Sequence, residues 1–347
     1  MKIFKDFLIL ISFFVLSAGV YYGGAKFHVP WYGASDYGDY YKMTVEPFSN
    51  SAQSPFAYRV FTPTIAHYIQ KSGFYYDSNK TPYKDNYLEH NDQSFIPSIL
   101  SALIFTNYLF FSFAAFFIYK SILIKLDSVN FTERIIAIGA PSLVFLSLST
   151  VVHGYAGLVE GASIFFISIL CYLALTNNLF LFLIFAILSI SQREIIPLVL
   201  SIYVSLAIGQ ERKISFAVTS IFAFSLYFII KSYLQIPGHE EQTQLAQLLT
   251  NLFNFSVNKE FILQGLLANN ILIYIFIVSI ALGSKNYRPF LPSAMIVTIL
   301  LILGIATGIE NNVGRILNMA IPFMLIGIAE VIKSQKSLHQ KSVSEST

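Results

Sequence analysis

The chain has 347 residues, of which 55% are hydrophobic and only 12% are charged. Soluble domains carry about 25% charged residues, and the net charge here is only +3. These values exclude an ordinary soluble enzyme, a disordered protein and a basic nucleic-acid-binding protein. The single cysteine, Cys171, excludes an intrachain disulfide and a cysteine-cluster metal site. A membrane-spanning helix needs only ~20 residues, so a hydrophobic chain of this length has room for many of them. The sequence therefore predicts a polytopic membrane protein.

Apolar runs recur along the chain and predict an all-α transmembrane helix bundle of about ten spans. The runs are apolar on all sides rather than alternating, as expected for helices in lipid. The two short runs around Gln192, Arg193 and Glu194 could instead form a re-entrant pair. The predicted spans cover residues 5–22, 96–119, 134–152, 158–176, 178–192, 195–209, 214–234, 263–283, 289–308 and 316–333.

The first run raises the alternative of a cleaved signal peptide, because Lys2 and Lys5 precede it. Tyr21 and Tyr22 favour a retained helix, since tyrosines concentrate at membrane interfaces. We therefore expect the first run to remain as a membrane-spanning helix.

Orientation follows from lysine and arginine, which mark the cytoplasmic side of short loops. This rule predicts that both termini are cytoplasmic and that the loops 23–95 and 235–262 lie outside. The basic connections carry Lys120, Lys125, Arg134, Arg212, Lys213, Lys285 and Arg288, and the tail carries Lys333, Lys336 and Lys341.

Residues 1–333 are predicted to form a single transmembrane domain. The polar tail 334–347 is predicted to be cytoplasmic and disordered. Within the long outside loop, the apolar-periodic stretch from Val60 to Ile69 predicts a short helix at the membrane surface.

Ionisable residues at membrane depth are costly and therefore informative. On this topology they gather at the outer ends of the helices, which predicts one outward-facing polar cavity. Guanidinium groups bind phosphate bidentately and keep their charge when desolvated. The set therefore suits an anionic, phosphate-bearing lipid. Its candidates are Asp36, Asp39, Tyr58, Arg59, His153, Glu160, Arg193, Glu194, Lys231, Glu310 and Arg315.

Several candidates also have a purely structural interpretation. Arg59, Lys231 and Arg315 could extend to lipid headgroups, and His153 could be an interfacial hydrogen-bonding residue. Arg193 and Glu194 could satisfy each other or a neighbouring helix. Glu160 is harder to explain in this way, because it lies about a turn inside a predicted span.

Two elements of the first loop resemble bacterial members of the GT-C class of integral membrane glycosyltransferases. They are Gly38-Asp39-Tyr40-Tyr41 and Pro55-Phe56-Ala57-Tyr58-Arg59-Val60-Phe61-Thr62-Pro63. Weaker similarity lies in Glu160, where relatives often have Asp, in Arg193-Glu194 and in Arg315 with Pro322.

The resemblance implies transfer of a sugar, a hexose or pentose, from a polyprenyl-phosphate donor by an inverting displacement. The acceptor would be a glycan or lipid-linked molecule at the outer face of the cytoplasmic (inner) membrane, in assembly of the cell-envelope glycan. Asp39 would be the general base, with Asp36 as the alternative. Arg59, Arg193 and Arg315 would contact the lipid phosphate.

Other functions remain open at this stage. A polymerase of lipid-linked oligosaccharides would also use outward-facing arginines, and a transporter or flippase could carry a polyprenyl-linked or other anionic substrate. No cofactor is required by any motif. A divalent cation stays open, because Asp36, Asp39 and Glu160 carry oxygens that could ligate one.

Overall fold

The computed structural model consists of helices, with no strand, throughout the part of the chain that it describes. The described residues are 2–27, 35–48, 58–75, 97–126, 130–147, 150–151, 154, 158–207, 212–234, single positions between 259 and 281, 291–306 and 312–346. The elements are α1 (Lys2–Phe27), α2 (Ser35–Val45), α3 (Phe61–Ser72), α5 (Pro97–Leu126), α6 (Phe131–Ser142), η3 (Leu143–Leu146), α8 (Glu160–Leu175), α9 (Leu179–Ile190), α10 (Ile195–Ala207), α11 (Lys213–Leu234), α15 (Leu291–Ala306), α16 (Asn312–Asn318) and α17 (Ile321–Ser346).

In the described part of the chain, three helices are long and apolar enough to cross a membrane, namely Ile3–Gly23, Ser98–Leu126 and Lys213–Leu234. Four others are apolar but shorter: Glu160–Leu175, Leu179–Ile190, Ile195–Leu206 and Leu291–Ile305. At 1.5 Å per residue, a 16-residue helix spans only ~24 Å of a hydrocarbon layer ~30 Å thick. The all-helical fold is confirmed for the described residues, with three helices that could cross a membrane, and the number ten stays a prediction.

The centre of the bundle is α8, packed closely against α5. Every residue of α8 except Tyr172 and Leu175 is buried, as expected for a helix that is apolar on all sides. Gly161 permits the close approach, because a Cβ atom there would lie 2.7–2.9 Å from atoms of Asn107. The Asn107 side chain in turn accepts a hydrogen bond from the Gly161 amide at 2.9 Å and donates one to the Leu158 carbonyl. These contacts hold the first turn of α8 against the middle of α5.

The helix α6 differs from the predicted span 134–152. It begins with a capping box between Asn130 and Glu133 and ends at Ser142, where η3 follows. Pro141 lies in the last turn of α6, where it removes one backbone donor and weakens the helix near its end. Of the predicted span 263–283 the structure describes only single positions, which are helical, and the rest lies outside the described residues.

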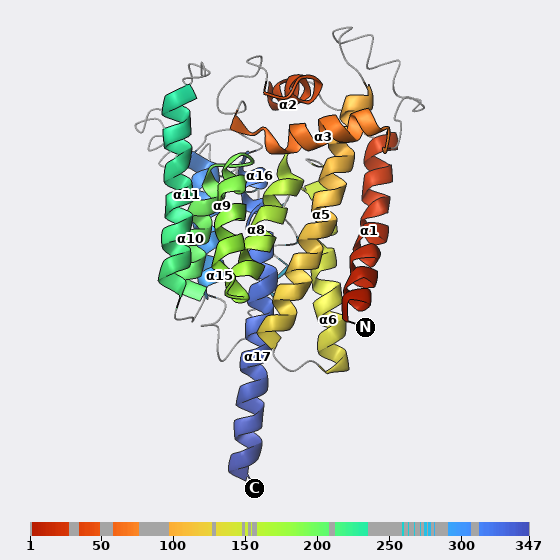
Figure 1. Ribbon diagram of the computed structural model, residues 1–347. Helices are drawn as coiled ribbons and strands as arrows, with labels where there is room; N and C mark the ends of the chain where they lie inside the picture. The colour runs from red at the N-terminus through yellow and green to blue at the C-terminus, as the bar shows by residue number, and fades with distance from the viewer. Residues whose placement is uncertain are drawn as a thin grey trace.

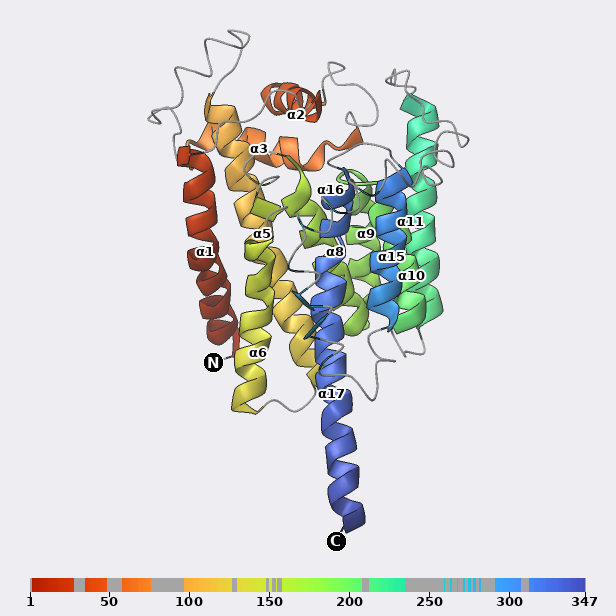
Figure 2. The same cartoon turned by 180° about the vertical axis from the view of Figure 1, so that it is seen from behind.

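Both chain ends lie at the same end of the bundle, and α2 and α3 lie at the opposite end (Figures 1 and 2). The predicted surface helix at Val60–Ile69 is present as α3, which lies across the ends of the other helices (Figure 1). Phe61 anchors it, with its ring centroid 4.9 Å from that of Phe166 in α8. The end of the bundle that carries α2 and α3 is called the α3 end below.

The end that carries the termini holds ion pairs between helices. Lys120 of α5 lies 2.8 Å from Asp6 of α1, and Lys125 of α5 pairs with Glu330 of α17. Lys336 of α17 lies 3.1 Å from Glu133 of α6. The structure also differs here from the predicted disordered tail, because α17 is helical to Ser346. Once a helix is nucleated by packing, each further residue adds a hydrogen bond at little cost.

Candidate functional site

A buried glutamate at the α3 end holds two arginines from different parts of the chain. Glu160 Oε1 accepts hydrogen bonds from Arg193 Nη2 at 2.9 Å and from Arg315 Nε at 2.7 Å. Glu160 is the first residue of α8, where the helix dipole favours a negative charge. Arg193 lies in the turn between α9 and α10, and Arg315 lies in α16. Three separate elements therefore meet at one carboxylate.

A second ion pair lies beside the first. Arg59, just before α3, donates from Nη2 to Glu194 Oε1 at 3.2 Å and from Nη1 to the Tyr40 hydroxyl at 3.3 Å. Tyr40 is fully buried in α2. Arg193 and Glu194 thus do not pair with each other: each pairs with a residue of another element. We call Arg59, Glu160, Arg193, Glu194 and Arg315 the arginine cluster.

Electrostatics connects the two pairs into one group. Burial lowers the pKa of Arg193, Glu160 opposes this effect, and both Arg315 and Arg59 lower the pKa further. Burial is the largest single influence on Glu194 and raises its pKa, but Arg59, a backbone hydrogen bond and Arg193 together outweigh it and leave the Glu194 pKa below its ordinary value. The Arg193 guanidinium therefore lies within the electric field of two others, Arg315 and Arg59, an arrangement that is costly without anions to match it.

Tyr58 joins the cluster from the same segment as Arg59. Its ring lies edge-to-face against Tyr227 of α11, with centroids 5.7 Å apart. The Tyr58 hydroxyl and Arg193 Nε are both buried and have no hydrogen-bond partner among the described residues. These two donors are directed into the protein and could bind a polar ligand.

The predicted catalytic carboxylates lie on α2. Asp39 is buried, and the ion pair described for it is with Lys42, at 3.9 Å between Oδ1 and Nζ. Tyr40, the next residue, reaches Arg59, so Asp39 lies one helical step (~100° around the helix axis) from a cluster contact. The backbone of Asp36 is in α2, but its side chain, like the whole of His153 and Glu310, falls outside the described residues.

Sequence reasoning missed Tyr40, Tyr227 and Gln192 as neighbours of the cluster. Tyr40 belongs to the first-loop element Gly38-Asp39-Tyr40-Tyr41, so the sequence did carry a signal for this residue. Tyr227 lies in an apolar helix and carries no such signal. Gln192 lies between two apolar runs, where its residue type is typical of a loop. Only its contacts in the structure distinguish it from an ordinary loop residue.

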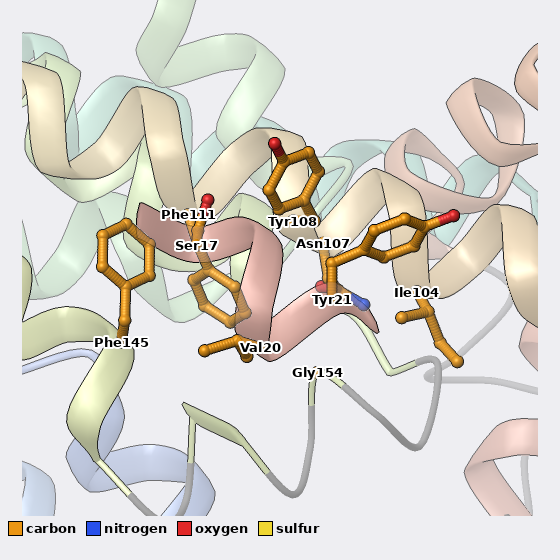
Figure 3. Close-up of a pocket in the computed structure, with 9 residues that line it drawn as sticks. All are labelled: Ser17, Val20, Tyr21, Ile104, Asn107, Tyr108, Phe111, Phe145 and Gly154. Atoms are coloured by element: carbon orange, nitrogen blue, oxygen red, sulfur yellow. The ribbon is translucent and has the colours of Figure 1, made fainter. Parts of the chain in front are cut away.

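The predicted cavity shared by all candidates stays a prediction. Glu160, Arg193 and Arg315 are only 2%, 6% and 8% exposed, whereas the side chains of Arg59 and Glu194 are 12% and 29% exposed, so the cluster is closed around Glu160 and reaches the surface at Glu194. A pocket in the described part of the chain lies elsewhere, between α1 and α5, where Ser17, Tyr21 and Phe111 face it (Figure 3). Among the described residues, no group of three His, Cys, Asp or Glu side chains could hold a metal ion.

No protein-family model, curated protein or solved structure matches the chain. The class of protein therefore rests on the fold and the cluster. The apolar helices indicate a helical membrane protein, and ion pairs between its elements lie at both ends of the bundle.

Proposed function

We propose that the protein is a membrane glycosyltransferase that moves a sugar from a polyprenyl-phosphate donor to a glycan or lipid-linked acceptor. The observation that carries this proposal is the meeting of Arg59, Arg193 and Arg315, from three elements, at the α3 end. It is further supported by the resemblance of the first-loop elements to membrane glycosyltransferases of the GT-C class.

Arginine suits the leaving group of such a reaction. The guanidinium ion keeps its charge when buried and offers a planar set of donors that matches two phosphate oxygens. The phosphate gains negative charge as its bond to the sugar breaks, so donors held in place beforehand stabilise the transition state. The buried Arg193 Nε and Tyr58 hydroxyl are suitable donors.

Asp39 is the proposed general base. The acceptor oxygen forms a bond to the anomeric carbon, its proton passes to Asp39, and the lipid phosphate leaves with the bonding electrons. This single displacement inverts the configuration of the sugar. The position of Asp39 beside Tyr40 on α2 supports a division of labour, in which arginines bind the phosphate and α2 faces the acceptor.

The test is an assay of the purified protein in lipid nanodiscs with polyprenyl-phosphate sugars and an envelope-lipid acceptor fraction, with products identified by mass spectrometry. We expect a glycosylated product from the wild type and from the control variant Asp6→Asn, which removes a carboxylate at the opposite end. Asp39→Asn should lose product and keep donor binding, whereas Arg59→Ala should lose donor binding.

The alternatives give different results in the same experiment. A polymerase would extend a lipid-linked oligosaccharide by whole repeats instead of single sugars. A transporter or flippase would move the lipid between leaflets of a vesicle and give no product. Lipid movement without product, in the wild type, would contradict the proposed function.

A further inference from the structure

One buried amide links the segments that carry the arginine cluster. Gln192 is completely buried. Its Oε1 accepts a hydrogen bond from Thr62 Oγ1 of α3 at 2.7 Å. Its Nε2 donates to the Val159 carbonyl, just before α8, and lies 3.4 Å from Ser163 Oγ.

Each of these contacts lies next to a cluster residue in the chain. Thr62 follows Arg59 by three residues, Val159 precedes Glu160, and Gln192 itself precedes Arg193. The backbone strengthens the same junction, because the Phe61 amide donates to the Ser191 carbonyl at 3.1 Å. A rigid amide with both ends bonded fixes the position of all three segments relative to one another.

We infer that Gln192 is a positioning residue that sets α3 in register with α8, so that the Arg59–Glu194 pair and the Arg193–Glu160–Arg315 group form one binding site. Removing one partner from these hydrogen bonds costs free energy, because a buried amide or carbonyl that has lost its partner has no water to replace it. The expected effect on lipid binding rests on the proposed function. The expected effect on the position of α3 is independent of that function.

Two variants separate the role of the amide from general stability. Gln192→Met keeps the length of the side chain and removes both polar ends. Thr62→Val is milder, because it removes only the hydroxyl that Gln192 accepts from. The matched control is Thr106→Val, which deletes a buried threonine hydroxyl that bonds only within α5.

The structural readout is the distance between spin labels on α3 and α9, measured by double electron–electron resonance. Tyr68 of α3 and Phe180 of α9 are exposed and accept labels as cysteines, while the native Cys171 is buried. We expect the distance distribution to shift or broaden in Gln192→Met and Thr62→Val and to stay unchanged in Thr106→Val. An unchanged distribution in both Gln192→Met and Thr62→Val would overturn the inference.

The binding readout is titration of the protein in nanodiscs with undecaprenyl phosphate, followed by native mass spectrometry. We expect binding to weaken by about 3- to 10-fold in the two test variants, the range of one buried hydrogen bond, and not in Thr106→Val. A changed distance with unchanged binding would contradict the positioning role. If the wild type binds no undecaprenyl phosphate, the proposed function fails, and the distance measurement alone decides whether Gln192 sets the register of α3.

Discussion

Glu160 and Arg315 are separated by 155 residues in the chain and meet at 2.7 Å. Arg193 shares the same carboxylate oxygen, so one buried acid neutralises charge from two distant segments. Such an acid contributes to stability chiefly through its partners, because each arginine would otherwise be buried without an anion.

Glu160→Gln should therefore destabilise the fold. Removing one member of a buried ion pair typically costs ~3–5 kcal/mol, since the remaining charge is left uncompensated. The measurement is the apparent unfolding temperature of the purified protein in detergent. Glu133→Gln is the control: Glu133 is also buried, but its partner Lys336 is 39% exposed and glutamine keeps a side-chain oxygen for the capping box, so a smaller loss is expected. Equal losses in the two variants would contradict the central role of Glu160.

Gly161→Ala should also be destabilising, for steric reasons. The added methyl group would lie 2.7–2.9 Å from Asn107, including its backbone. Overpacking of a buried contact costs ~1–3 kcal/mol. Gly139→Ala is the matched control, since nothing lies within 4 Å of a Cβ atom there. Alanine is the better helix former, so thermal unfolding should show Gly139→Ala unchanged or slightly more stable.

Asp39→Asn should reduce turnover by ~10²–10⁴-fold, the usual contribution of general-base catalysis. Donor affinity should change little, because the substitution keeps shape and polarity and the phosphate is assigned to the arginines. Asp36→Asn should have a much smaller effect. The measurement is the turnover number and the donor affinity of each purified variant. A large loss of turnover in Asp36→Asn, with little change in Asp39→Asn, would assign the general base to Asp36 instead.

The Arg59–Glu194 pair should make stability depend on acid pH. Burial disfavours the charged carboxylate, but Arg59, with a backbone hydrogen bond and Arg193, outweighs burial and holds the Glu194 pKa below its ordinary value of ~4.3. The resulting stabilisation is present above that value and is lost as the pH falls through the lower folded-state pKa. Unfolding temperatures of the wild type and Glu194→Gln should therefore converge below pH 4. A constant difference from pH 7 to pH 3 would show that the ionised pair contributes nothing.

The α3 end should face away from the cytoplasm. Cysteines placed at Ser72, just at the end of α3, and at Ser337 in α17 are both exposed. An impermeant thiol reagent on intact cells should label Ser72→Cys, and it should label Ser337→Cys only after the membrane is permeabilised. The reverse result would invert the topology predicted from lysine and arginine.

The sequence by itself determined the helices and the residue types that matter. Long apolar runs without alternation give α1, α5 and α11, and a short periodic stretch gives α3, because these patterns are local. The arginines and acids of the α3 end were equally visible, since an ionisable group next to an apolar run stands out. Pro141, one residue before the end of α6 at Ser142, was also a visible local signal.

Only the tertiary structure decided which charges meet. Arg193 and Glu194 are neighbours in the chain, but they pair with Glu160 and Arg59, 33 and 135 residues away respectively. Consecutive side chains in a turn point in different directions, and the partner of each depends on which helices pack beside it. That packing follows from contacts such as Gly161 against Asn107 and from the Gln192 amide between α3 and α8, and no local pattern encodes them.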